Sequence, residues 1–412
     1  MGKTIAVVGA GAAGMMAAIC AARAGAQVTV YERNDRVGKK ILATGNGKCN
    51  FSNENMGSEW YYGSGRLLVE EVYRTFGLQE TKTFFTDLGM RIKNRNGYLY
   101  PASEQAATVL DVLRYEMMRL SIDIHTNQQI VGIKKQRGGF VIEAADQKKY
   151  RYDAVILTCG GKAAPKTGSD GQGFGLARQM GHQIVPTVPA LTALRCKENF
   201  YKQIAGVRCE AGLALWIGKQ KVCMERGELQ ITDYGISGIP VFQMSRQAAY
   251  ALRDQKCTTV EIDFMPDYND NEFVSFWNER WVRQKDQSME QFVTGIVNKK
   301  IGLLLLKLAD MKETEKAANV PKSKREKLGR LYRAFPVTVK ETNSYEQAQV
   351  CAGGVDCREV TKKLESDIVH GLYFAGEMLD VDGICGGYNL QWAWSSGAVA
   401  GMAAAKCSDK ED

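Results

Sequence analysis

The stretch that decides the fold is KTIAVVGAGAAGMMAAICAARAGAQVTVYE, residues 3–32. Its opening, up to Val8, is a short apolar run rich in β-branched residues, which predicts a strand. An alanine-rich segment to about Ala24 predicts a helix, and the residues from Gln27 to Tyr31 predict a second strand. Strand, turn, helix and strand form one βαβ unit, so we expect an α/β fold with a Rossmann-like domain.

The turn of this unit carries three glycines, Gly9, Gly11 and Gly14, in the GxGxxG spacing. They allow a tight turn, leave room for a pyrophosphate against bare backbone, and let the helix pack closely on the strand. The helix that begins near Ala12 points its positive end at the phosphates. Glu32, eighteen residues beyond Gly14, can accept hydrogen bonds from ribose hydroxyls. The pattern predicts a bound dinucleotide.

A second glycine-rich segment, FAGEMLDVDGICGGYNLQWAWSSG, occupies residues 374–397. An NAD-only dehydrogenase needs no such segment near its C-terminus, so this one favours a flavin whose ribityl chain lies along a strand end. Either Glu377 or Asp380 would accept a hydrogen bond from a ribityl hydroxyl. The following helix start would stabilise negative charge on the reduced ring. Its N–H groups near Tyr388, Asn389 and Leu390 would face the pyrimidine edge.

The length of 412 residues exceeds what one hydrophobic core supports, so two or three domains are expected. Short β-strands separated by polar turns are predicted between residues 189 and 266, and helices from 269 to 333. We therefore predict a discontinuous FAD-binding domain that is interrupted by an inserted β-rich domain and a helical subdomain. The predicted boundaries are 1–188 with 336–412 for the FAD-binding domain, 189–268 for the β-rich domain and 269–335 for the helical subdomain.

Composition narrows the function classes. With 3 histidines, and 11 cysteines that form no CxxC pair, a metal centre or a disulfide framework is not expected. No apolar run is long enough for a membrane span and no signal peptide is recognisable, so we expect a cytoplasmic protein without a membrane partner. Residues 280–333 hold 14 Lys and Arg against 6 Asp and Glu, an excess equal to the net charge of +8. That stretch is either a solvated helical face or a patch for an anionic partner such as nucleic acid.

Several strings together resemble the BaiN/YhiN-like family of FAD-dependent oxidoreductases, which are aminoacetone oxidase-like flavoproteins. Besides the two glycine-rich segments, the strings are LATGNGKCNFSN from Leu42, DAVILTCGGKAAPKTGSDGQG from Asp153, GELQITDYGISGIPV from Gly227 and AQVCAGGV from Ala348. They span nearly the whole chain in order. The resemblance implies a two-dinucleotide-binding flavoprotein fold with an inserted β-barrel-like and helical module.

The resemblance also implies a set of FAD contacts. These are Gly9, Ala10, Gly11, Ala13, Gly14, Glu32, Arg33, Thr44, Gly45, Asn46, Gly47, Cys49, Asn50, Val131, Cys159, Gly160, Gly161, Gly376, Glu377, Asp380, Gly387, Tyr388, Asn389 and Leu390. Lys40 is added as a residue that either neutralises phosphate or is solvated. The turn at Gly45 to Gly47 can lay backbone against the isoalloxazine ring, and Val131 could pair its backbone with the adenine edge.

Flavin carries the redox chemistry, so the protein need supply only orientation, exclusion of water and one proton donor. Tyr388 and Tyr234 are the candidate proton donors, although each could serve packing alone. Cys49 is a candidate nucleophile, although a single cysteine in such a loop also serves as a small space-filler.

We expect hydride transfer through flavin N5. The resemblance implies both reduction of conjugated C=C bonds in steroid acids and oxidation of small amino ketones and does not choose between them; we favour reduction of a conjugated C=C bond of a steroid-acid-like substrate. The alternatives are oxidation of a small amino ketone such as aminoacetone, an RNA-binding or RNA-modifying flavoprotein, and a flavin-binding protein without turnover. A second nicotinamide-binding fingerprint is absent, because the glycines from Gly168 to Gly175 lack an acidic partner after a second strand. The hydride would therefore come from NAD(P)H that binds transiently, from the substrate itself or from a partner protein.

Overall fold

The structure is a computed structural model that describes residues 2–406. The chain divides into two compact units, and each is described by itself. Unit 1 contains both ends of the chain, Met1–Val188 and Tyr345–Asp412. Unit 2 is the segment between them, Pro189–Ser344.

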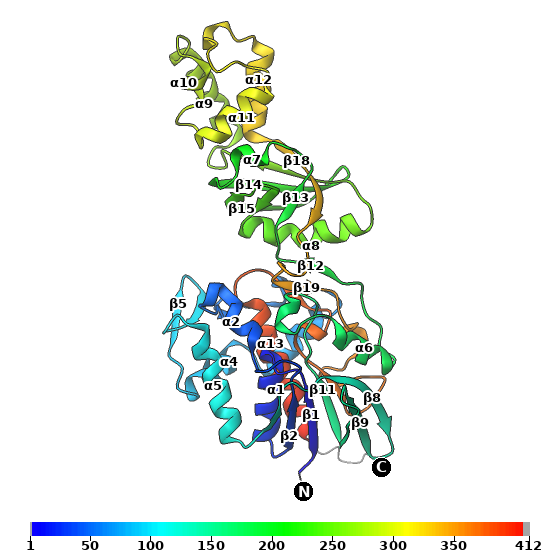
Figure 1. Ribbon diagram of the computed structural model, residues 1–412. Coiled ribbons are helices and arrows are strands. Elements are labelled where there is room, and N and C mark those ends of the chain that lie inside the picture. The colour runs from blue at the N-terminus through cyan, green and yellow to red at the C-terminus, as the bar shows by residue number, and fades with distance from the viewer. Residues whose placement is uncertain (1, 407–412) are drawn as a thin grey trace. The chain divides into compact units, whose positions relative to one another are not determined.

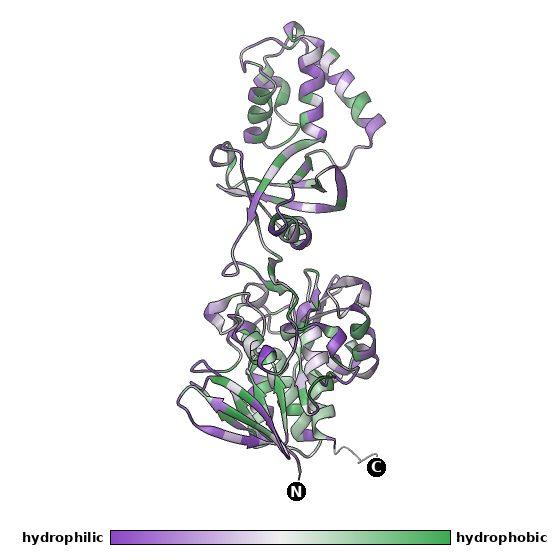
Figure 2. Cartoon of the chain, turned by 90° about the vertical axis from the view of Figure 1, so that its right-hand side faces the viewer, coloured by the Kyte–Doolittle hydropathy of each residue, from purple (hydrophilic) through white to green (hydrophobic). Residues whose placement is uncertain are grey.

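A five-stranded parallel sheet in the order β20-β11-β1-β2-β7 is the centre of unit 1 (Figure 1). Its strands are β1 (Thr4–Val8), β2 (Gln27–Tyr31), β7 (Asp123–His125), β11 (Ala154–Leu157) and β20 (Leu372–Phe374). The inner strands are apolar along their length because both faces of a parallel sheet are covered (Figure 2). The βαβ unit predicted over residues 3–32 is confirmed.

Helix α1 (Ala12–Arg23) lies against α13 (Tyr388–Ala405), so the two ends of the sequence meet. A Cβ added at Gly397 would lie 2.4 Å from the carbonyl oxygen of Ala13, and one at Gly401 would lie 2.3 Å from that of Ala17. Only glycine permits backbones this close. These two glycines, one turn apart on α13, therefore set the separation of the helices.

Two antiparallel three-stranded sheets, in the orders β10-β9-β8 and β3-β6-β5, and the pair β21-β4 complete the strand pairing described for unit 1. Their strands are β3 (Ser52–Asn53), β4 (Tyr61–Tyr62), β5 (Ile92–Arg95), β6 (Tyr98–Pro101), β8 (Ile130–Gln136), β9 (Gly139–Ala144), β10 (Lys149–Tyr152) and β21 (Asp382–Gly383), and β19 (Val350–Ala352) lies in the returning chain. The helices are α2 (Lys39–Ala43), α3 (Arg66–Thr75), α4 (Leu78–Asp87), α5 (Ala106–Arg119) and α6 (Gln172–Gln179). Short 3₁₀ turns are η1 (Thr44–Gly47), η2 (Ser58–Trp60), η3 (Pro165–Thr167), η5 (Cys357–Glu359) and η6 (Gly376–Met378).

Unit 2 contains a closed barrel in the strand order β13-β16-β15-β14-β17-β18. The strands are β13 (Leu194–Cys196), β14 (Arg208–Ile217), β15 (Gln220–Ile231), β16 (Gly235–Ser237), β17 (Thr258–Asp263) and β18 (Phe335–Thr342), and β12 (Val188–Ala190) precedes them. Residues that alternate along β14 and β17, such as Leu213, Leu215, Val260 and Ile262, are buried in its core. This alternation is typical of a barrel whose interior is filled by side chains.

The helices of unit 2 are α7 (Tyr201–Ile204), α8 (Ile239–Arg253), α9 (Asp270–Arg283), α10 (Met289–Val293), α11 (Lys299–Leu308) and α12 (Lys322–Arg333), with the 3₁₀ turn η4 (Ala317–Asn319). Aromatic packing holds α9 and α10 together, because the rings of Trp281 and Phe292 lie 4.1 Å apart between centroids. Arg280 donates hydrogen bonds to the carbonyls of Phe292 and Thr294. Part of the positive charge of residues 280–333 is therefore tied to backbone.

Two sequence predictions about the inserted region differ from the structure. The return to unit 1 was predicted at residue 336, but β18 pairs with β13 and β17 as a barrel strand, so unit 2 continues to Ser344. Strands alone were predicted between 189 and 266, but Ile239–Arg253 forms α8. Its buried residues Val241, Met244 and Ala248 follow helical spacing, which the neighbouring β-strand patterns concealed.

Candidate cofactor and active site

The three glycines of the first turn have different surroundings. Gly9 has φ +103°, and a Cβ there would lie 2.6 Å from the carbonyl oxygen of Thr158. A Cβ at Gly14 would lie 1.9 Å from the carbonyl oxygen of Gly9. By contrast, Gly11 has an extended backbone with φ −79°, and nothing lies within 4 Å of a Cβ added there. The protein itself requires glycine at positions 9 and 14, whereas at position 11 it leaves open space beside the uncapped start of α1.

Glu32 closes this turn from the end of β2. One of its carboxylate oxygens accepts a hydrogen bond from the backbone N–H of Ala10 at 2.9 Å. The other accepts from the backbone N–H and the side-chain amide of Asn34, at 2.9 and 2.7 Å. These bonds hold the buried carboxylate beside the glycine turn and leave lone pairs for ribose hydroxyls. The adjacent Arg33 forms a 2.5 Å ion pair with Asp170.

The carboxyl end of β20 leads into Gly376, whose backbone is held on both sides by α13. Its carbonyl accepts from the indole N–H of Trp392 at 3.2 Å, and its N–H donates to the hydroxyl of Ser396 at 2.9 Å. A Cβ at Gly376 would lie 2.8 Å from the side chain of Ala13. Residues of the first and second glycine-rich segments are therefore in direct contact.

The two acidic residues after Gly376 have different partners. Glu377 forms a 2.6 Å ion pair with Lys40 and accepts a hydrogen bond from the backbone N–H of Cys351. Asp380 accepts a 2.7 Å hydrogen bond from the backbone N–H of Ser64 through one oxygen. Its other oxygen, Oδ1, is buried and has no hydrogen-bond partner among the described residues. Because an unpartnered buried carboxylate oxygen is costly, Asp380 is the better placed of the two to accept from a ligand hydroxyl.

Helix α13 begins without a side-chain cap at Gly387, which has φ +94°. Asn389 instead bonds back to Gly383, accepting from its N–H and donating to its carbonyl at 2.8 Å each. The Oδ1 atom of Asn50 lies 2.9 Å from the position of a Cβ at Gly387, and it is also buried without a hydrogen-bond partner in the described part of the chain. A second unsatisfied acceptor therefore lies beside Gly387, the residue that precedes Tyr388 at the start of α13.

The loop that precedes Asn50 has unusual backbone. Gly45 and Asn46 both have left-handed φ and ψ, with φ near +55° and +52°. The hydroxyl of Thr44 donates to the carbonyl of Ile41 at 2.6 Å, which fixes the entry to the loop. The turn through Gly47 is exposed, so its backbone is accessible to a ligand.

The remaining cofactor candidates lie on neighbouring elements of unit 1. Cys159 donates its S–H to the carbonyl of Val8 at 3.4 Å, so the Cys159 to Gly161 turn follows β11 next to the glycine turn. Val131 lies at a shift of register in β8, and its carbonyl accepts from the side-chain amide of Gln179 at 3.3 Å. Its side chain is exposed.

The structure does not support two of the three catalytic candidates. Cys49 is fully buried, and burial raises the pKa of its thiol to about 12, so a nucleophilic thiolate is not available at neutral pH. The hydroxyl of Tyr388 is buried and already donates to the carbonyl of Asn55 at 3.0 Å. Burial also raises the pKa of Tyr388 to about 12. Tyr234, in unit 2, has a half-buried side chain whose oxygen accepts from Asn343 at 3.0 Å.

Sequence reasoning missed the polar network beneath the start of α13. The amide of Gln391 accepts from Ser52 at 2.6 Å and donates to Thr81 at 2.7 Å and to Ser395 at 2.8 Å. All four side chains are completely buried. The only available signal was a glutamine in an otherwise apolar helix, which by itself does not identify its partners.

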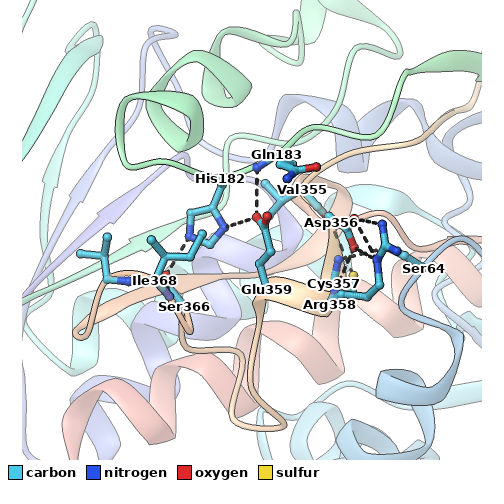
Figure 3. Close-up of polar contacts among 11 residues, drawn as sticks. Ser64, His182, Gln183, Val355, Asp356, Cys357, Arg358, Glu359, Ser366 and Ile368 are labelled. Atoms are coloured by element: carbon cyan, nitrogen blue, oxygen red, sulfur yellow. Dashed lines mark hydrogen bonds and ion pairs between the residues drawn. The ribbon is translucent and has the colours of Figure 1, made fainter.

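A second buried cluster resembles a catalytic triad but has another role (Figure 3). His182 lies between Ser366, at 2.7 Å from Nε2, and Glu359, at 3.1 Å from Nδ1. The Ser366 oxygen already accepts from the backbone N–H groups of Ile368 and Val369, so its proton points to His182. His182 and Ser366 are buried and Glu359 is partly exposed, and their contacts tie η5 to the segment that follows α6. It is a structural anchor.

The geometry of unit 1 fits a dinucleotide that carries a polyhydroxylated chain. The glycine turn contributes open space at Gly11 and the uncapped start of α1. The carboxy-terminal segment, which contacts this turn, contributes the uncapped start of α13 and the unpartnered oxygens of Asp380 and, beside Gly387, of Asn50. Within the residues that the structure describes, no group bonds to these two oxygens or lies within 4 Å of a Cβ at Gly11. Among residues 2–406, no helix is long and apolar enough to cross a membrane. The same described residues contain no group of three or more His, Cys, Asp or Glu side chains that could hold a metal ion.

Comparison with known proteins gives the family. A profile described as the HI0933-like protein Rossmann domain matches residues 3–403. The chain belongs to the HI0933-like Rossmann family. This family corresponds to the BaiN/YhiN-like FAD-dependent oxidoreductases predicted from the sequence motifs, so the predicted fold class and the assignment as an FAD-dependent oxidoreductase are confirmed.

Relatives of this HI0933-like protein include two kinds of named enzyme. It is 44% identical over 405 residues to a 3-dehydro-bile acid delta(4,6)-reductase of Clostridium scindens, covering 98% of this chain and 99% of that protein. It is 28% identical over 398 residues to a ribosomal RNA dihydrouridine synthase of Haemophilus influenzae, covering 95% of each. A solved structure of a 3-ketosteroid delta1-dehydrogenase from Sterolibacterium denitrificans aligns with 98% of this chain and 99% of that chain, with a TM-score of 0.49 and 13% identity.

Proposed function

We propose that this protein is an FAD-dependent reductase of a carbon–carbon double bond conjugated with a carbonyl in a small steroid-acid-like molecule. The observation that carries the proposal is the 44% identity, over nearly the full length of both chains, to a 3-dehydro-bile acid delta(4,6)-reductase. The substrate named for that relative places a double bond in conjugation with a ketone. We place the reaction in the cytoplasm.

We assign FAD to the connected segments of unit 1. Gly11, which leaves open space, and the uncapped start of α1 would hold the pyrophosphate. Glu32 would accept hydrogen bonds from the adenosine ribose, and the Oδ1 atom of Asp380 would accept from the ribityl chain. The assigned contacts are Gly9, Ala10, Gly11, Ala13, Gly14, Glu32, Arg33, Lys40, the Thr44–Asn50 loop, Val131, Cys159, Gly160, Gly161, Gly376, Glu377, Asp380, Gly387, Tyr388, Asn389 and Leu390.

FAD, when bound, supplies the hydride that the double bond receives. The residues of the chain would orient the flavin and polarise its ring. The uncapped start of α13 provides backbone N–H groups and a positive dipole end, which favour negative charge at the pyrimidine edge. The buried Gln391 network holds that helix start against β3 and α4. The substrate gains two electrons with the hydride and one proton from a donor group or water, which balances reduction to the saturated bond.

NAD(P)H is proposed as the reductant that binds transiently. The test begins with the visible spectrum of the purified protein, in which flavin bands are expected. Anaerobic titration with NADH and then NADPH should bleach these bands with one of them. Addition of a steroid acid that carries a 3-oxo-4,6-diene should restore the bands and yield a product heavier by two hydrogens. A flavoprotein that is reduced but never reoxidised by such enones would refute the substrate class, and bleaching by aminoacetone instead would support the oxidase alternative.

A second candidate is the reduction of uridine in RNA. Two ribosomal RNA dihydrouridine synthases, at 28% and 27% identity, each match over 95% of both chains, and dihydrouridine likewise arises by reduction of a conjugated double bond. The positive excess of residues 280–333 is compatible with an RNA partner. Binding of unmodified ribosomal RNA that weakens steeply with salt, together with dihydrouridine formation, would favour this candidate over the steroid acid.

A further inference from the structure

The two carboxylate oxygens of Glu32 are unequally occupied by donors of the protein itself. Oε2 accepts one hydrogen bond, from the backbone N–H of Ala10 at 2.9 Å. Oε1 accepts two, from the backbone N–H of Asn34 at 2.9 Å and from the side-chain amide of Asn34 at 2.7 Å. Each oxygen of a carboxylate offers about two lone pairs. Asn34 therefore fills Oε1, whereas Oε2 keeps a lone pair for a ligand.

The backbone on which these two side chains stand is fixed by the segment that follows β7. The N–H of Glu32 donates to the carbonyl of His125, and the carbonyl of Glu32 accepts from the N–H of Gln128, at 2.9 Å each. The carbonyl of Asn34 accepts from the N–H of Asn127 at 2.8 Å. With the main chain held at both residues, only rotation of a side chain could change the partners of the carboxylate.

The side-chain amide of Asn34 is also held from its other side. One hydrogen of Nδ2 is donated to Glu32, and Nδ2 also donates to the carbonyl of Thr167 at 3.0 Å. Both hydrogens of the amide nitrogen are therefore used. The loop that contains Thr167 is tied to the same place a second time, because Asp170 pairs with Arg33. Rotation of the Asn34 amide away from Oε1 would break its bond to this loop.

The adenosine ribose of FAD carries two neighbouring hydroxyls, and each has one proton to donate. A carboxylate with both oxygens free can accept both protons, whereas the Glu32 carboxylate has a lone pair left only on Oε2. We propose that Asn34 is a positioning residue that occupies Oε1 and limits Glu32 to one of the two ribose hydroxyls. The inference rests on the proposed assignment of FAD, and it concerns the adenosine half, which ADP carries without the flavin.

The test uses the full-length apoprotein, freed of flavin and first shown to rebind FAD. It is titrated in a calorimeter with ADP, 2′-deoxy-ADP and 3′-deoxy-ADP. Removal of the hydroxyl that Glu32 accepts should weaken binding by at least about tenfold, because a hydrogen bond to a charged group is lost. Removal of the other hydroxyl should change Kd by less than about twofold, since that hydroxyl meets no free lone pair of the carboxylate.

Asn34→Ala distinguishes positioning from a merely structural role. The backbone N–H of residue 34 remains, so the variant frees one lone pair of Oε1 and lets the carboxylate accept both hydroxyls. Its binding should then weaken on removal of either hydroxyl, whereas structural damage would weaken all three ligands by one common factor. Gln128→Ala is the matched control, because its backbone also bonds to Glu32 but its side chain donates to Asp146. The control should keep the wild-type pattern.

The wild-type titrations alone can overturn the inference, so it stays testable even if Asn34→Ala does not fold. Equal weakening by both deoxy analogues would show that Glu32 accepts both hydroxyls in spite of Asn34. No weakening by either analogue would show that Glu32 accepts neither of them. A wild-type chain that rebinds no FAD would instead refute the cofactor assignment at the first step. The enone assay of the holoprotein tests the proposed reaction separately, because ADP binding involves no substrate.

Discussion

The amino-terminal glycine turn and the carboxy-terminal segment from Gly376 to Leu390 differ in how far the protein satisfies them. Around the turn, the carboxylate of Glu32 has three hydrogen-bond donors from its own chain. In the carboxy-terminal segment, the Oδ1 atom of Asp380 is buried and has no partner within residues 2–406, and the same is true of the Oδ1 atom of Asn50 beside Gly387. In the first region, the protein itself satisfies the hydrogen bonding of the buried carboxylate. In the second region, two buried oxygen atoms would gain hydrogen-bond donors only from a ligand.

Substitution within the glycine turn should give the largest effects, and it separates folding from binding. Gly14→Val places a side chain where a Cβ alone would lie 1.9 Å from the Gly9 carbonyl, so we expect a loss of more than about 4 kcal/mol and no soluble folded protein. Gly11→Val meets open space, so the protein should fold normally but lose FAD affinity by at least about 100-fold, because the side chain fills the pyrophosphate position. Circular dichroism and flavin content distinguish the two outcomes. A Gly11→Val protein with stoichiometric flavin would contradict the assignment of the turn.

Asp380→Asn tests the ligand-dependent region. Removing a buried charge whose Oδ1 has no partner should leave the apoprotein as stable as wild type or more so, while weakening the charge-assisted bond to the ribityl chain by about tenfold in Kd for FAD. Asp356→Asn is the matched control, since its equally buried carboxylate is paired with Arg358 (Figure 3). That variant should lose up to about 1 kcal/mol of stability and keep its FAD affinity. Equal FAD binding by both variants would remove Asp380 from the site.

The same comparison explains what the sequence could predict. The glycine turn is a local pattern, so its strands and helix were predicted correctly from residues 3–32. The choice between Glu377 and Asp380 could not be made, because it depends on Lys40 and Ser64, which lie more than 300 residues away. For the same reason, the proton of Tyr388 could not be known to be bound by Asn55. Long-range partners decide which polar groups remain free for a ligand.

Acid should loosen the structural anchor that His182 forms with Glu359 and Ser366, outside the cofactor site. Burial lowers the pKa of His182 from its usual 6.5, while Glu359 opposes this less strongly. A folded pKa below the unfolded value means that unfolding takes up a proton, so this contribution to stability is present above about pH 6.5 and is lost as the pH falls through the folded pKa. Protonation at Nε2 would also oppose the proton that Ser366 directs to it. We expect Tm to fall by a few degrees between about pH 7 and pH 5, and to fall less in His182→Gln. Identical pH profiles for the two proteins would show that other groups cause the loss.

The smallest effect is expected at Cys49, which lies in the loop between η1 and β3. Its thiol is fully buried with a pKa near 12, so Cys49→Ala should leave kcat and the flavin spectrum within about twofold of wild type and cost about 1 kcal/mol through the small cavity. Iodoacetamide should label the exposed Cys257 in the folded holoprotein and spare Cys49, as mass spectrometry of the peptides would report. Loss of turnover in Cys49→Ala with full flavin content would mean that the thiol becomes accessible during catalysis, and the loop would then belong to the reacting part of the site.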